Sequence, residues 1–303
     1  MKKNATLIAA GFVFLGSITF SIKAVLVKLA YQYDVDTLSL LALRMSFALP
    51  FFVGIAIYST RKNDKLKTPV TLSKQDWTTL AFLGIIGYFA ASYLDFWGLQ
   101  YISASMERLI LFIYPTIVLL LNAVFFKEKI NRIQIIALLI TYVGISIVFA
   151  EGLSITQQPN FVLGGFLVFC CAITYAIYLV GSGRLLPRLG TLRFTSHAMI
   201  FACLAVIIQH GIIQQWQLSG FAPQVYFYAF LMATLATVLP TLLVSEGIRV
   251  IGASNASIIG SVGPISTILL AYIFLGERLE FLQWIGAIVV IGGVLLVSLQ
   301  RRR

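Results

Sequence analysis

Apolar runs of roughly 20 residues, separated by short polar breaks, recur along the whole chain. A bilayer core needs about 20 mainly apolar residues for each helical crossing, so each run predicts one membrane-spanning helix. We expect an all-α integral membrane protein with ten transmembrane helices. The expected spans lie near residues 6–28, 37–58, 78–97, 102–126, 133–150, 161–181, 194–213, 224–246, 253–275 and 281–299.

Composition and charge support this prediction and orient the chain. Hydrophobic residues make up 59% of the chain and charged residues only 11%, whereas soluble domains are about 25% charged. The net charge of +11 comes from Lys and Arg that gather in alternate loops and at both ends. Cytoplasmic loops carry the excess of Lys and Arg, so both termini are predicted to be cytoplasmic, in the plasma (inner) membrane. The basicity therefore reflects orientation, and we expect no nucleic-acid partner.

The sequence contains no recognisable catalytic signature. It lacks a phosphate-binding Gly-Lys loop, which argues against ATP-driven pumping. Its two histidines, His197 and His210, have no metal-ligand or nucleophile spacing, and its three cysteines fall inside expected spans. We therefore predict no enzyme activity, no cofactor and no metal site.

The chain is predicted to be a duplication. An offset of 149 residues aligns Pro115 with Pro264 and Glu128 with Glu277, together with many small residues between them. We expect a first half at 1–150, an external connector at 151–160 and a second half at 161–303. Five spans per half is an odd number, so the second half enters the membrane inverted. Inverted repeats are a recurring plan of secondary transporters, in which the substrate binds between the halves.

Four stretches carry a resemblance to a known family. They are GLQYISASMERLILFIYPTIVLLLNAVFFKEKI at 98–130, GIRVIGASNASIIGSVGPISTILLAYIFLGERL at 247–279, FSIKAVLVKLA at 20–30 and LSLLALRMSFAL at 38–49. The chain resembles the drug/metabolite transporter superfamily, in particular its EamA-type members. The resemblance implies ten spans, two EamA repeats and transport of small metabolites. It leaves the substrate open among amino acids, other small metabolites, nucleotide sugars and drugs. The charged Glu107-Arg108 pair departs from the uncharged residues more usual there.

Charged residues inside the expected spans are the candidate substrate site. A charge in a membrane span is costly and marks a functional hypothesis by default. Five such residues fall about 5 to 10 Å from the outer ends of first-half spans, at a rise of 1.5 Å per residue, and the aligned second-half positions are uncharged. We expect this ionic cluster to flank a cavity at the interface of the repeats, where one unpaired cation receives a carboxylate and an acidic side chain can receive an ammonium group. Its members are Lys23, Arg44, Asp95, Glu107 and Arg108. The remaining lining is predicted to be Tyr93, Trp97, Tyr114, Tyr175, Tyr178 and Asn255.

Structural readings of the same residues stay open. Arg108 could pair with Asp95 across an external turn, and the Lys23 ammonium could extend to the outer headgroups. Proline frees a backbone carbonyl and kinks a helix, so Pro115 and Pro264 are predicted hinges around the cavity. The alternative is that these prolines only set helix shape.

The predicted function is secondary transport of a small metabolite across the plasma membrane by alternating access. An amino acid or another small carboxylate is the favoured substrate, and export is the favoured direction. The alternatives are a lipid flippase or small-molecule channel on the same fold, or a membrane-embedded lipid-modifying enzyme. Proton coupling through Glu107 or Asp95 and the oligomeric state are left open. The expected partners are the small-molecule substrate and the lipid bilayer.

Overall fold

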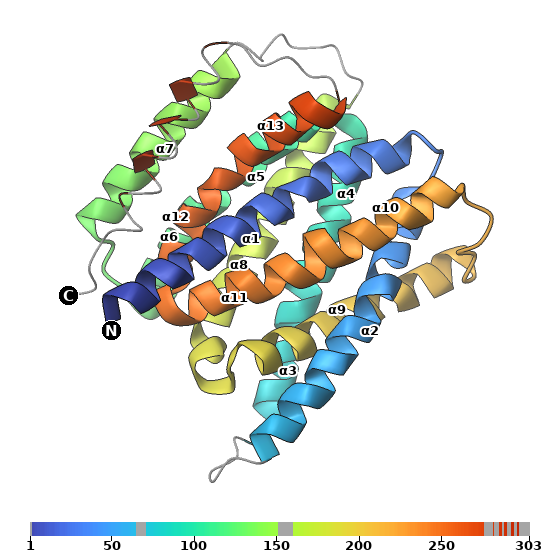
Figure 1. Ribbon diagram of the computed structural model, residues 1–303, viewed down its shortest axis with the longest axis horizontal. Coiled ribbons are helices and arrows are strands. Elements are labelled where there is room, and N and C mark those ends of the chain that lie inside the picture. The colour runs from blue at the N-terminus through green and yellow to red at the C-terminus, as the bar shows by residue number, and fades with distance from the viewer. Residues whose placement is uncertain are drawn as a thin grey trace.

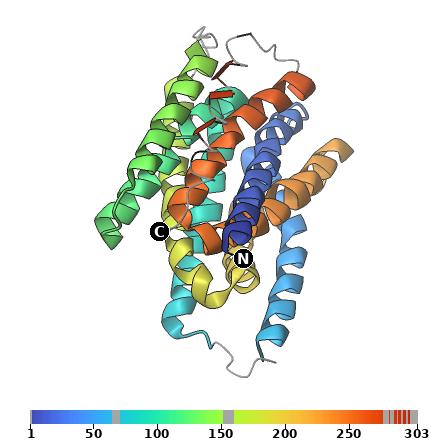
Figure 2. The ribbon, with the colours of Figure 1, turned by 60° about the vertical axis from the view of Figure 1, so that its left-hand side comes forward.

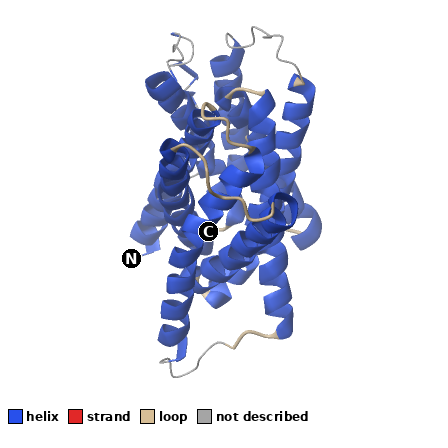
Figure 3. Cartoon of the chain, turned by 90° about the vertical axis from the view of Figure 1, so that its right-hand side faces the viewer, coloured by secondary structure: helices blue, strands red, loops and turns tan. Residues whose placement is uncertain are grey.

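The protein is helical throughout the part of the chain that is described. The computed structural model describes residues 2–64, 71–150 and 160–275, and isolated positions 281, 285, 286, 288, 289, 292, 293 and 296. Among these residues there is no β-strand, and short loops join the helices (Figures 1 and 3). The all-α prediction is thus confirmed for this part of the chain.

Seven helical segments among the described residues are long and apolar enough to cross a membrane. Uninterrupted helices form α1 (Lys2–Tyr31), α2 (Thr37–Asp64), α8 (Phe161–Leu189) and α9 (Thr191–Gln214). The other crossings are composite: α3 (Lys74–Gly84), η1 (Ile85–Ala90) and α4 (Ala91–Tyr101); α10 (Pro223–Ala233), η2 (Thr234–Val238) and α11 (Leu239–Ile251); α12 (Ala253–Ile259), η3 (Gly260–Val262) and α13 (Gly263–Leu275). They match seven of the expected spans.

The other three expected spans are not among these seven segments. The run at 102–126 is two helices, α5 (Ala104–Leu111) and α6 (Tyr114–Phe126), because Pro115 has no backbone N–H and begins a helix more easily than it continues one. The run at 133–150 forms a single helix of 19 residues, α7 (Arg132–Ala150). Most of 281–299, and residues 151–159 of the expected connector, lie outside the described residues. The count of ten spans therefore stays a prediction.

The two halves of the chain interleave rather than sit apart. Helix α1 lies between α11 and α13 of the second half, α2 packs along α9, and α4 packs along α8 (Figure 1). Helix α7 lies at the edge of the bundle in two views, where it contacts α12 (Figures 1 and 2). The buried core is therefore built mainly from contacts between the halves, which is where a central site can form.

Departures from α-helix recur at equivalent places in the two halves. The segments η1 and η2 are π-helical, and adding 149 to Ile85 gives Thr234, where η2 begins. The break between α5 and α6 recurs as the 3₁₀ segment η3, because Leu111 plus 149 gives Gly260. Helical irregularities of this kind are frequent at functional sites. The duplication predicted from side chains is thus visible in the backbone as well.

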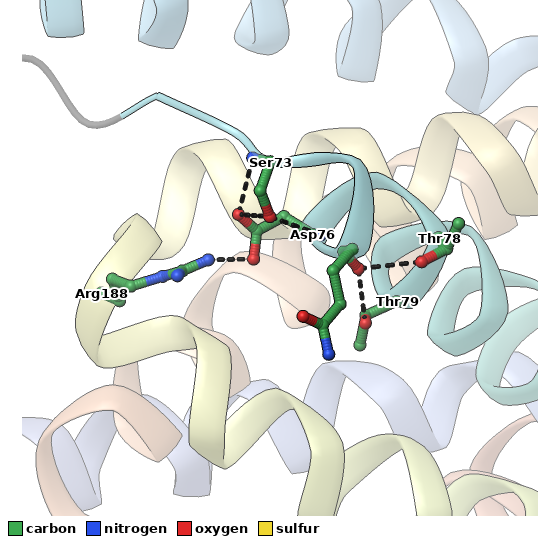
Figure 4. Close-up of polar contacts among 6 residues, drawn as sticks. Ser73, Asp76, Thr78, Thr79 and Arg188 are labelled. Atoms are coloured by element: carbon green, nitrogen blue, oxygen red, sulfur yellow. Dashed lines mark hydrogen bonds and ion pairs between the residues drawn. The ribbon is translucent and has the colours of Figure 1, made fainter.

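Polar contacts fix the start of α3 and tie it to the second half. The Ser73 hydroxyl accepts a hydrogen bond from the Asp76 amide at 3.1 Å, and the Ser73 amide donates to Asp76 Oδ2 at 2.8 Å. These reciprocal bonds form a capping box, which satisfies amides that have no partner within the helix. Arg188, near the end of α8, forms an ion pair with the other Asp76 oxygen (Figure 4). Asp76 therefore serves both the local helix start and a contact between the halves.

The close approach of α3 and α9 can be tested with a single methyl group. A Cβ added at Gly84 would lie 2.1 Å from the Ala198 carbonyl oxygen, and that backbone atom cannot move aside cheaply. We expect Gly84→Ala to lower the free energy of unfolding by about 1 to 3 kcal/mol, measured by thermal unfolding in detergent micelles. The control is Gly54→Ala, where a Cβ meets nothing within 4 Å. Equal stability of the two variants would contradict the close packing of these two helices.

Candidate functional site

A central cavity lies between the two halves of the chain. The space not filled by atoms, which includes space open to the outside, is about 680 Å³. First-half helices contribute Ser17, Phe20, Lys23, Gly87, Tyr88, Ala91, Ser92, Arg108, Leu111, Phe112 and Tyr114. Second-half helices contribute Cys171, Tyr175, Val244, Gly260, Gly263 and Pro264. The irregular segments η1 and η3 thus both form part of the cavity wall.

Two buried ion pairs stand at one side of this cavity. Lys23 on α1 places its Nζ 2.5 Å from Asp95 Oδ2 on α4. On α5, Arg108 Nε lies 3.1 Å from Glu107 Oε2. Arg108 also donates from Nη2 to the Phe20 carbonyl oxygen at 3.2 Å. All four charged residues are buried, and Asp95 and Glu107 have no exposed surface at all. The pairs therefore lie in a medium where each charge depends on its partner.

The cations and the acids of these pairs are placed differently. Lys23 and Arg108 line the cavity, and we refer to them as the two cavity cations. Asp95 and Glu107 lie behind them and do not line it, and the described residues give neither carboxyl a hydrogen bond of normal geometry. The two carboxyl groups, here the acid pair, lie within hydrogen-bonding reach of each other. The cavity wall is therefore positive, with acidic groups held just behind it.

Arg44 is buried away from the cavity lining. Its Nε donates to Thr237 Oγ1 of η2 at 2.8 Å, and its guanidinium carbon lies 5.3 Å from the centre of the Phe96 ring. Within the described residues it forms no ion pair, and both of its terminal nitrogens lack a hydrogen-bond acceptor. Arg44 therefore links α2 to the π-helical segment η2 from outside the cavity.

Aromatic side chains shape the rest of the cavity. The Tyr114 hydroxyl donates to the Ser257 carbonyl oxygen at 3.1 Å and fills the space beside Gly260, where an added Cβ would lie 2.3 Å from it. The Tyr175 ring packs against Phe20 and Tyr114 at centroid distances of 6.3 and 5.3 Å. Tyr114 thus joins the two halves across the cavity and limits its width.

A second pocket lies at the predicted cytoplasmic ends of the helices. This inner pocket contains about 990 Å³ of unfilled space and includes Asn255. Hydrogen bonds cross between the halves here: Asn122 Nδ2 donates to Ser254 Oγ at 3.0 Å and Gln134 Nε2 to Asn255 Oδ1 at 2.9 Å. The predicted site residue Asn255 therefore belongs to this inner contact and does not line the central cavity.

The structure groups the predicted site residues differently from the sequence. Lys23, Arg108, Tyr114, Tyr175 and the predicted hinge Pro264 line the central cavity. The others do not line it: Arg44, Tyr93, Asp95, Trp97, Glu107, Pro115 and Tyr178. The structural readings change as well, because Arg108 pairs with Glu107 instead of Asp95, and the Lys23 ammonium is buried against Asp95 instead of extending to the headgroups.

Sequence reasoning missed several cavity residues. Ser17, Gly87, Tyr88, Ser92 and Cys171 line the cavity but are small or aromatic residues of a kind found throughout the spans. One signal was available for Gly87 and Tyr88, because the helix that carries them has two glycines three residues apart. Glycine allows close approach, and a Cβ at Gly87 would lie 2.2 Å from the Tyr178 Cβ.

The sequence matches a family model in both of its halves. The model of the EamA-like transporter family matches residues 7–150 and 162–299. Among similar proteins, one from Bacillus subtilis (strain 168), named uncharacterized transporter YcbK, is 31% identical over 95% of this chain and 91% of its own length. Another from the same organism, named uncharacterized transporter YyaM, is 29% identical over 71% of each chain.

A solved structure has a similar fold. This crystal structure superposes on 96% of this chain and 96% of its own, with a TM-score of 0.72 and 16% sequence identity. At that identity the likeness concerns the arrangement of helices alone. It supports the interleaved bundle described above and says nothing of the residues in the cavity.

The Lys23–Asp95 pair gives a prediction about stability. Lys23→Met leaves the Asp95 carboxylate without its nearest cation, and loss of one partner of a buried pair costs about 3 to 5 kcal/mol. We expect thermal unfolding in detergent to show this loss, and the double variant Lys23→Met/Asp95→Leu to recover most of it. The control is Arg184→Met/Glu128→Leu, which removes a half-exposed ion pair of 2.7 Å and costs at most about 1 kcal/mol. Additive losses in the Lys23/Asp95 double variant would show that the two residues do not depend on each other.

Proposed function

Since the chain belongs to the EamA-like transporter family, we propose that it is a secondary transporter whose substrate is a small solute bearing a carboxylate, bound in the central cavity. One observation carries the choice of substrate: Lys23 and Arg108 line the cavity, whereas none of its described lining residues is acidic. A cationic wall attracts an anion, and Arg offers paired donors that match a carboxylate. The Tyr and Phe rings provide an apolar surface for the remainder of the solute.

The same observation makes the amino-acid prediction more specific. The sequence-based prediction was that acidic and basic side chains both line the cavity, so that an ammonium group of the solute would have an acidic partner. The acid pair lies behind the cavity cations, so the cavity offers an ammonium only hydroxyl, carbonyl and aromatic groups. We therefore favour solutes recognised through their carboxylate, with amino acids and other small carboxylates as members of that class.

Alternating access by two inverted five-span halves is the proposed mechanism. Equivalent irregularities, η1 with η2 and the α5/α6 break with η3, support two related halves that exchange conformations. Pro115 and Pro264 begin the helices that follow the equivalent breaks and are the proposed hinges. Ten spans, cytoplasmic termini and a plasma-membrane location belong to the same proposal. Export stays the sequence-based prediction of direction.

The alternatives are less favoured. A lipid flippase needs a groove that admits two acyl chains, whereas Tyr114 narrows the cavity by bonding across it to Ser257. A channel needs a continuous path, whereas hydrogen bonds join the two halves across the inner end, from Asn122 to Ser254 and from Gln134 to Asn255. A lipid-modifying enzyme would need charged groups at the interface, whereas Lys23 and Arg108 face the cavity and the other members of the ionic cluster are buried. The similar proteins are named as transporters, which favours transport over catalysis.

Solute exchange in liposomes tests the function. Purified protein is reconstituted with the same labelled solute on both sides at equal pH, using phenylalanine, glutamate and succinate in turn. We expect at least one to exchange, and Lys23→Gln or Arg108→Gln to slow exchange at low concentration about ten- to a hundredfold, which corresponds to the 1.5 to 3 kcal/mol of a charged hydrogen bond.

Charge-conserving variants and an exposed residue provide the controls. Lys23→Arg and Arg108→Lys retain the cation and are expected to retain more exchange than the Gln variants. Arg61→Gln changes an exposed arginine near the end of α2 and is expected to exchange at the wild-type rate. Phenylalaninamide, which lacks the carboxylate, is expected not to compete with phenylalanine. If the amide competes equally, recognition through the carboxylate is wrong.

The proposed topology has its own test. Green fluorescent protein matures in the cytoplasm, whereas alkaline phosphatase is active outside it. We expect fusions after residue 303 to fluoresce and to show no phosphatase activity, because cytoplasmic loops carry the excess of Lys and Arg. Phosphatase fused within 151–160 is expected to be active. The opposite pattern would invert the orientation, and an active phosphatase at both sites would rule out five spans in the second half.

A further inference from the structure

We propose that the acid pair Asp95–Glu107 is a proton site linked to the solute, so that the transporter carries one proton together with each solute carboxylate. This inference rests on the proposed function, since it concerns the same cavity. It adds a co-transported ion and fixes the sign of the coupling: solute and proton bind together and cross together.

The first argument is the position of the acid pair. Asp95 and Glu107 have no exposed surface, lie within hydrogen-bonding reach of each other and receive no hydrogen bond of normal geometry from the described residues. Two ionised carboxylates can only accept hydrogen bonds, so they repel each other at this range unless one of them holds a proton. A buried carboxyl pair of this kind is a site where a single proton is shared.

The second argument is competition for the same cations. Lys23 Nζ lies 2.5 Å from Asp95 Oδ2, and Arg108 Nε lies 3.1 Å from Glu107 Oε2. These are also the cations that line the cavity, so an arriving carboxylate has to take over part of their charge. Each acid then loses some of the attraction that kept it ionised. The solute carboxylate adds one negative charge to the buried groups, and a proton on the acid pair makes their total charge zero again. Linkage is reciprocal, so a proton on the pair also frees the cations for the solute.

The other charged groups near the acid pair do not change the direction of this coupling, in which an anionic solute favours protonation of the pair. Arg44 on α2 acts on Asp95 from outside the cavity, but it is fixed by Thr237 and does not reach the solute. Helix α13 packs against α5 and carries no acidic or basic residue between Gly263 and Leu275. The other titratable groups near the acid pair are neutral in their ordinary forms: Tyr31 on α1, Cys171 and Tyr175 on α8, and Tyr114 on α6. Binding of an anion therefore favours protonation of the acid pair.

The proton is transferred without any covalent step. It comes from water on the side to which the cavity is open and binds to one carboxyl oxygen of the acid pair while the solute carboxylate contacts Lys23 and Arg108. Both are released on the other side, and the carboxylates pair again with the cations. A solute of charge −1 and one proton move no net charge, so a pH difference drives this transport and a membrane potential does not.

Accumulation in a pH gradient tests the coupling. Proteoliposomes that have passed the exchange test at equal pH receive the exchanging solute of the panel outside, with the outside one pH unit more acidic and the potential clamped by valinomycin and potassium. For a solute of charge −1 we expect about tenfold accumulation, because one proton per solute transmits the whole gradient of about 1.4 kcal/mol. Reversing the pH gradient is expected to deplete the solute.

Variants assign the effect to the acid pair. Glu107→Gln and Asp95→Asn are close in shape but cannot share a proton in this way. We expect them to exchange solute at a reduced, measurable rate and to accumulate none in the pH gradient. Glu246→Gln, which removes an acid that pairs with Arg249 at the inner end, is expected to accumulate the solute as the wild type does. Infrared spectra provide a second measurement: addition of the exchanging solute at neutral pH is expected to increase the band of a protonated carboxyl in the wild type and to leave the spectrum of Glu107→Gln without that increase.

The outcomes separate the two proposals. If no member of the panel exchanges at equal pH, both the proposed function and this inference are overturned. If solute exchanges but does not accumulate in a pH gradient, the protein is a facilitator, and only the inference is wrong. Accumulation when the inside is more acidic would mean antiport and would also overturn it. Gradient-driven accumulation that survives in both acid variants would place the proton elsewhere.

Discussion

The neutralisation of two buried cations by two buried acids is the interaction on which the central site depends. Lys23 and Arg108 can face a cavity inside a membrane protein only because Asp95 and Glu107 stand behind them. Such pairs are seldom needed for stability, since apolar residues of similar size often pack as well. The second half illustrates this. Its helix α12 is aligned with α5, and it has Ala256 in place of Glu107 and Ser257 in place of Arg108. The fold does not require these charges, so a reason for them has to be sought in binding.

Helical irregularities bring polar backbone and side chains to the cavity. The π segment η1 places Gly87 and Tyr88 in its wall, and the segment η3 places Gly260 opposite the Tyr114 hydroxyl. Irregular backbone within a membrane is tolerated where protein or a cavity surrounds it. The interleaving of the two halves provides those surroundings. The segment η1 packs against α8 and α9, and the segments η2 and η3 pack against α1. The ion pairs and the breaks thus form one site rather than two separate features.

The sequence was a good guide to helices and to unusual charges, and a poor guide to which side chains face one another. Seven expected spans match because hydropathy reports burial in lipid directly. The ionic cluster was found because a charge in a span is rare, yet its internal pairing was not predictable. A pair between Arg108 and Asp95 was one of the open structural readings, but Arg108 pairs with Glu107, its neighbour in sequence. The π segments had no sequence signal, since one residue added to a helical turn leaves an apolar run apolar.

The paired π segments also bear on the history of the chain. A π turn holds one residue more than an α turn, so such a segment records an inserted residue, retained although it loosens the helix. Because η1 and η2 begin 149 residues apart, in the same register that aligns Pro115 with Pro264, the insertion is most simply dated to the common ancestor of the two repeats. The buried charges, in contrast, are found in one copy only. The two copies therefore share the loosened helix and differ in the chemistry that each brings to the cavity, so exchanging their conformations would not exchange their charges.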